Sequence, residues 1–115
     1  MNSQNNDNSY YDKKRLGQEI ERIDELKNDL KRYNDQLSDD LAKTRREMED
    51  LLSSNLLNIK EYDLILNNRE KIIKLERDKE EEFDSYISNL NNSREEHIDL
   101  QNRLSEESEE ENEEK

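Results

Sequence analysis

The chain has 115 residues, of which 44% are charged and only 28% are apolar, and its formal net charge is −13. It contains one glycine and no proline, cysteine or tryptophan, which excludes disulfides and thiolate metal sites. So little apolar surface argues against a compact globule, and leaves a long helix or a disordered segment as the two alternatives.

The charge also restricts the class of partner. Nucleic-acid binding needs clustered lysine and arginine, whereas the 19 basic residues are scattered among 32 acidic ones. No stretch approaches the roughly 18 apolar residues of a membrane span, and the first residues lack the apolar core of a signal peptide. We therefore expect no nucleic-acid binding, no direct membrane insertion and a cytoplasmic location.

Three segments follow one another along the chain. Residues 1–8 are predicted to form a disordered tail, and Ser9 with Asp12 three residues later suits the start of a helix. Residues 9–104 are predicted to form a coiled-coil helical region. Residues 105–115, which are strongly acidic, are predicted to form a second disordered tail.

One heptad frame accounts for the helical region. With Ile20 at position a, apolar residues recur at a and d without insertion or deletion, and the frame passes through Ser53, Ser54 and Asn55 unchanged. This predicts an all-α fold, either one long coiled-coil helix or a helical hairpin, and favours continuous helix through the serines. The predicted partner-binding seam consists of Leu16, Ile20, Ile23, Leu30, Leu37, Leu41, Met48, Leu51, Tyr62, Ile65, Ile72, Phe83, Tyr86, Leu90, Leu100 and Leu104.

The seam has two weak regions. Asn55 and Asn58 occupy core positions, and further along Arg69, Glu76 and Lys79 leave few apolar residues. These are the predicted places for a bend, near 53–58 or 67–80. Three seam asparagines could instead fix the register of helix pairing, as buried amides do in coiled coils; they are Asn34, Asn55 and Asn58.

The middle of the chain is apolar beyond the seam. Leu57, Leu64 and Leu75 widen the stripe, and an extra apolar face is formed by Leu52, Leu56, Ile59, Leu66 and Ile73. A two-stranded coiled coil does not need so wide a stripe, so we expect packing against more than one helix, as in a three- or four-helix bundle. A single helix has nothing against which to bury this surface. The expected partners are therefore other helical protein chains, in a hetero-oligomer or, as an alternative, a homodimer.

No recognisable site chemistry accompanies the heptads. His97, the only histidine, falls on the seam without the carboxylates that a metal would need beside it, and Tyr33, Tyr62, Phe83 and Tyr86 are predicted to be core aromatics. We expect no enzyme activity, no catalytic residue, no metal and no cofactor.

Four segments carry a family resemblance. In order, "IDELKNDL" (23–30), "DLAKT" (40–44), "SSNLLNIKEY" (53–62) and "SYISNLN" (85–91) resemble subunit 2 of the biogenesis of lysosome-related organelles complex, over about residues 23–104. Met48 stands where that family tends to carry tyrosine, and an acidic tail replaces the end of its last helix. The resemblance implies a cytosolic, non-enzymatic subunit of a hetero-oligomeric helical complex that acts in endosome and lysosome trafficking.

Two further hypotheses remain open. The size and the Asn-, Lys- and Glu-rich composition are similar to those of the small helical partners, or targeting chaperones, of LXG-domain effectors in bacterial type VII secretion. A homodimeric coiled-coil spacer or cytoskeletal adaptor requires nothing beyond the heptads.

Overall fold

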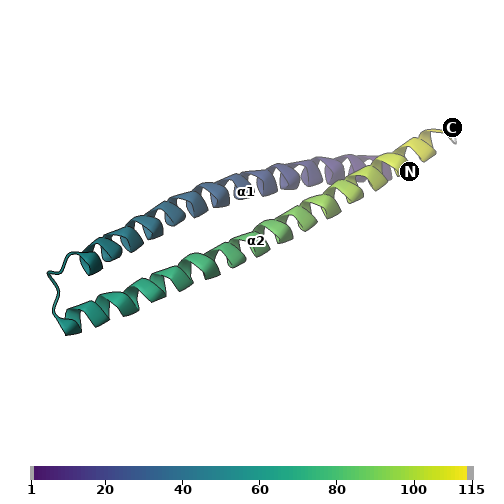
Figure 1. The fold of residues 1–115 in the computed structure, drawn as a ribbon. Coiled ribbons are helices and arrows are strands. Elements are labelled where there is room, and N and C mark those ends of the chain that lie inside the picture. Colours follow the sequence, from purple (N-terminus) through teal and green to yellow (C-terminus); the bar gives the residue numbers. More distant parts are fainter. Residues whose placement is uncertain (1, 114–115) are drawn as a thin grey trace. The chain divides into compact units, whose positions relative to one another are not determined.

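Two long helices make up the fold. The computed structural model describes the backbone of residues 2–113 and the side chains of residues 11–107. Helix α1 spans Asn2–Ser53 and helix α2 spans Ile59–Glu113, and the described residues include no strand (Figure 1). The predicted all-α fold is confirmed, and of the two predicted forms the chain adopts the one with two helices.

Both helices extend into the predicted tails. Residues 2–8 and 105–113 have helical backbone, and neither segment contains a glycine or proline that would stop a helix. The predicted disorder of Met1 and of residues 114–115 lies outside the described residues.

The connection between the helices occupies residues 54–58, so the prediction of continuous helix through Ser53, Ser54 and Asn55 is wrong. The amide of Ser54 bonds the carbonyl of Leu51 at 3.2 Å, and Asn55 takes φ of 61°, the left-handed conformation that commonly follows a helix C-terminus. An unchanged heptad phase was poor evidence for continuity, because each helix of a hairpin can rotate independently about its own axis.

Helix α2 begins at a cap formed by Asn58. Its side-chain oxygen accepts a hydrogen bond from the backbone amide of Glu61 at 2.8 Å, and its side-chain nitrogen donates to the Glu61 carboxylate at 2.6 Å. From there α2 continues unbroken through 67–80, where the sequence indicated the second bend.

The chain divides into two compact units. Unit 1 comprises Met1–Asn28 with Ile87–Lys115, and the buried apolar side chains among its described residues are Leu16 and Ile23. Here Arg94 donates to Asp24 at 2.8 Å, and the side-chain amide of Gln101 donates to the backbone carbonyl of Lys13 at 3.3 Å. Unit 1 is therefore a helix pair with a small apolar core.

Unit 2 comprises Asp29–Tyr86 and is a helical hairpin around the 54–58 loop. Its cross-helix pairs run from Glu49–Arg69 to Arg45–Glu76, so the two segments are antiparallel. Its one buried side chain is the polar Asn34, and every apolar side chain of this unit is half-buried or exposed. Unit 2 therefore lacks a closed apolar core.

Candidate functional site

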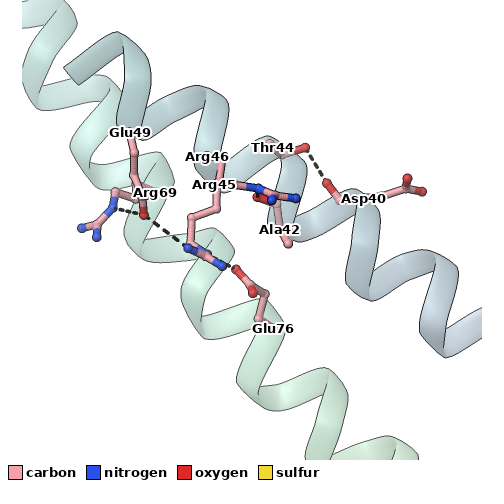
Figure 2. A network of polar contacts seen from close by, with 8 residues as sticks. All are labelled: Asp40, Ala42, Thr44, Arg45, Arg46, Glu49, Arg69 and Glu76. Carbon is pink, nitrogen blue, oxygen red and sulfur yellow. Dashed lines mark hydrogen bonds and ion pairs between the residues drawn. The ribbon is translucent and has the colours of Figure 1, made fainter. Parts of the chain in front are cut away.

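An ion-pair network crosses unit 2 near its loop (Figure 2). The guanidinium of Arg45 donates to Glu76 at 2.9 Å, and that of Arg69 donates to Glu49 at 3.2 Å. Arg45 also reaches Glu49, one turn away on its own helix, at 3.4 Å. All four side chains are only about one-third exposed, and the network joins α1 to α2 in one register.

The charges in the network stabilise each other. The bond from Arg69, followed by that from Arg45, holds the pKa of Glu49 below its ordinary value. The bond to Glu76 raises the pKa of Arg45 in the same way. Both groups therefore stay charged at neutral pH, and the network serves to pair the helices.

A second polar cluster surrounds Lys79, whose side chain is only 12% exposed. Its ammonium donates to Ser38 at 2.6 Å, to Glu80 at 2.7 Å and to the side-chain oxygen of Asn34 at 3.0 Å. Asn34 also donates to Glu80 at 3.4 Å, and the bond from Lys79 lowers the pKa of the Glu80 carboxyl. The ammonium has three donors and all three are used, so Lys79 is a structural residue.

Of the three seam asparagines, only Asn34 lies between the helices. Asn55 and Asn58 belong to the loop and the cap. The second region that the sequence indicated as weak does not bend α2. Its polar core residues Arg69, Glu76 and Lys79 instead pair α2 with α1.

A groove of about 430 Å³ lies beside this cluster, between α1 and α2 of unit 2. Leu30, Tyr33 and Leu37 line it from α1, and Leu75, Phe83 and Tyr86 line it from α2, with Asp78 and Glu82 at its margin. Tyr33, Leu75 and Tyr86 are 66%, 53% and 59% exposed. The prediction that Tyr33, Tyr62 and Tyr86 belong to the core is therefore wrong. Tyr33 and Tyr86 stand at the open side of the groove, and Tyr62 is 42% exposed.

The apolar surface continues beyond the groove along each helix. Leu51 lies eighteen residues, or five helical turns, after Tyr33, and therefore on the same side of α1. Leu64 lies eleven residues, or about three turns, before Leu75, and therefore on the same side of α2. Leu51 and Leu64 are both exposed. We call the exposed residues Tyr33, Leu51, Leu64, Leu75 and Tyr86, together with the groove between them, the groove face.

The opposite flank of α2 is also apolar. Ile59, Leu66 and Ile73 recur every seven residues, on the far side of the line of residues that faces α1. Ile59 and the loop residue Leu56 are each 82% exposed, and Ile73 is 39% exposed. The extra apolar face predicted from the sequence is thus open at these three residues and half-buried at Leu52 and Leu66.

The predicted seam residues differ in burial. Leu16 and Ile23 are buried, and four others are exposed: Leu51, Tyr62, Tyr86 and Leu100. The rest are half-buried, namely Ile20, Leu30, Leu37, Leu41, Met48, Ile65, Ile72, Phe83, Leu90 and Leu104. Whether a partner binds any of them stays a prediction.

In unit 1, His97 is bonded at both ring nitrogens. Its Nε2 lies 2.7 Å from Glu19, and its Nδ1 lies 2.6 Å from the carbonyl oxygen of Ser93. The bond to Ser93, followed by that to Glu19, raises the pKa of His97 above its ordinary value. The His97 side chain therefore bonds across the helix pair of unit 1 and does not face a cleft.

Among the described side chains, no three His, Asp and Glu groups gather as a metal site would require. Within residues 2–113, neither helix has a stretch apolar enough to cross a bilayer. Comparison with protein-family models, curated proteins and solved structures finds no match for this chain. The exposed apolar surface of unit 2 is the feature with the clearest capacity to bind.

Proposed function

We propose that the chain is a non-enzymatic helical subunit or adaptor, which packs unit 2 against helices of another protein in a hetero-oligomeric complex. One observation carries this proposal: among the described side chains of unit 2, the single buried one is the amide Asn34, while large apolar side chains lie exposed. Burial of apolar surface is the main favourable contribution to folding, so a hairpin without a closed apolar core is marginal until another helix covers it.

The net charge favours a different protein as the partner over a second copy of this chain. Two copies would each carry a formal net charge of −13, and the repulsion between them opposes association. A homodimeric spacer is therefore the weaker candidate.

The cellular pathway rests on resemblance alone. Endosome and lysosome trafficking follows from the likeness of residues 23–104 to the lysosome-related organelle subunit, and export of a secreted effector follows from composition. Both stay predictions, and the two imply the same physical activity, helix binding without catalysis.

The test combines the isolated chain with its native complex. Purified alone, the chain should be monomeric by light scattering, should unfold at a low urea concentration by circular dichroism, and should exchange the amides of unit 2 rapidly. Tagged and purified from its own cells, it should co-elute in stoichiometric amount with a helical protein, and these amides should become protected. An isolated monomer that resists high urea concentrations and protects the amides of unit 2, with no complex in the cell, would overturn the proposal.

The choice of variant matters in this test. Ile65 is half-buried in the hairpin, so Ile65→Asp should both damage unit 2 and abolish binding. Substitutions at the exposed residues Leu75 and Ile73 separate the two effects, because they leave the contacts between α1 and α2 in place.

A further inference from the structure

We propose that the groove face binds one amphipathic helix of the partner, whose apolar stripe is flanked by lysine or arginine. This inference rests on the proposed function and adds to it the place of contact and the chemistry of the bound segment. Three features of unit 2 support it: the length of the face, its shape and the charge at its margin.

The length of the face fits a helix. Leu64, Leu75 and Tyr86 recur every eleven residues and so share one side of α2. The distance from Leu64 to Tyr86 along the helix is roughly 33 Å at about 1.5 Å per residue. A partner helix of about 22 residues would span it, whereas a small molecule in the groove would cover only its Tyr86 end.

The shape of the face also fits a helix. The groove runs between two antiparallel helices, with apolar side chains from both on its walls. A third helix can place a row of side chains in such a groove, as in a three-helix bundle. Leu37 and Phe83, half-buried on opposite walls, are positioned to become the core beneath that row.

The charge at the margin specifies what flanks the stripe. Asp78 and Glu82 stand at the groove, and Asp40 lies two turns beyond Tyr33 on the same side of α1. Lys79 is the one cationic residue lining the groove, and its ammonium is already bonded to three acceptors within unit 2. The margin is acidic at the groove itself, since Lys71 lies two turns before Asp78 on the same side of α2. On a chain of net charge −13, this acidic margin selects a basic helix and repels a second copy.

The probe is a synthetic amphipathic helix of 22 residues, with leucines along one stripe and lysines on both sides of it. Its matched control carries glutamate in place of every lysine. Fluorescence anisotropy of each labelled peptide is measured with the full chain. The lysine peptide should bind, its affinity should fall as salt rises from 50 to 500 mM, and the glutamate peptide should bind at least about tenfold more weakly.

Variants then locate the binding. Leu75→Asp should weaken binding of the lysine peptide at least about tenfold, because it places an unpaired charge against the stripe. The double variant Asp78→Lys with Glu82→Lys should also weaken it and should flatten the salt dependence. Ile73→Asp, on the opposite flank of the same helix, is the matched control and should bind as the unaltered chain does. Circular dichroism of each variant verifies that helicity is unchanged.

Several outcomes would overturn the inference. These are equal binding of the two peptides, equal weakening by Leu75→Asp and Ile73→Asp, or a dimer of the chain alone that Leu75→Asp dissolves. The same variants, tested in the native complex, distinguish failure of this inference from failure of the proposed function. If Ile73→Asp breaks that complex while Leu75→Asp leaves it intact, the chain is still a helix-binding subunit but the groove face is not its binding surface.

Discussion

The polar cluster in unit 2 supports a quantitative prediction. Replacing Asn34 by leucine removes one of three acceptors around the Lys79 ammonium, which is only 12% exposed. Hydrogen bonds to charged groups contribute about 1.5–3 kcal/mol each, and a buried donor without a partner costs about 1–3 kcal/mol. Since Ser38 and Glu80 remain as acceptors, we expect Asn34→Leu to destabilise the chain by about 1–2 kcal/mol.

The reciprocal change should have a similar cost. Lys79→Met leaves the buried Asn34 oxygen without its donor, and an unsatisfied buried acceptor costs about 1–3 kcal/mol. Combining Asn34→Leu with Lys79→Met removes both polar partners and adds apolar contact between the helices. Such a paired replacement is often neutral or stabilising, so the double variant should be more stable than either single one.

The assay is a double-mutant cycle, with the chain unfolded by urea and followed by circular dichroism at 222 nm. Each single variant should lower the free energy of unfolding by about 1–2 kcal/mol, and the coupling free energy should be about 1–2 kcal/mol or more. Leu75→Ala, exposed at the groove, controls for an ordinary surface change. The reasoning is refuted if both single variants are neutral, or if the double variant loses the sum of their effects.

Three further predictions concern the loop and unit 1. Asn58→Ala removes the cap of α2 and should destabilise the chain by about 1 kcal/mol in the same urea assay. Asn55→Ala should cost about 1 kcal/mol because alanine is strained at φ of 61°, whereas Asn55→Gly should be neutral or stabilising. The bond to the Ser93 carbonyl, followed by that to Glu19, raises the pKa of His97 in the folded chain. The contribution of His97 to the stability of the chain is therefore complete below the ordinary pKa of 6.5, and it is lost as the pH rises through the raised pKa of the folded chain. His97→Gln should therefore lower the urea midpoint more at pH 5.5 than at pH 8.5, and the reverse order would contradict this sign.

Properties that depend on neighbouring residues, namely helical periodicity and helix capping, account for what the sequence could predict. Helical periodicity and the absence of proline indicated an all-α chain, and the heptad frame put Leu16, Ile23 and Asn34 at core positions, where the structure buries all three. The loop was detectable too, because Asn58 followed by Glu61 is a capping pattern. The similar pattern at Ser9 and Asp12 predicted a helix start wrongly, since α1 already begins at Asn2. The heptad frame runs through the Asn58 cap unbroken and so pointed to continuous helix.

The sequence alone could not predict which residues of α1 pair with which residues of α2. Arg69, Glu76 and Lys79 are unfavourable at core positions until Glu49, Arg45 and Asn34 lie opposite them. Sequence alone does not identify partners 20 to 46 residues away. For the same reason, the heptad frame could not show that Tyr33 and Tyr86 border a groove rather than fill a core.

The spacing of the polar pairs has a consequence for folding kinetics. Glu49 and Arg69 are 20 residues apart, Arg45 and Glu76 are 31 apart, and Asn34 and Lys79 are 45 apart. Closing a longer segment costs more chain entropy, so the hairpin should close first at its turn and then zip toward its open end. Transition-state φ-values should accordingly decrease from the first pair to the third. A nascent chain could form this turn and its nearest ion pair before the later residues of α2 have been synthesised.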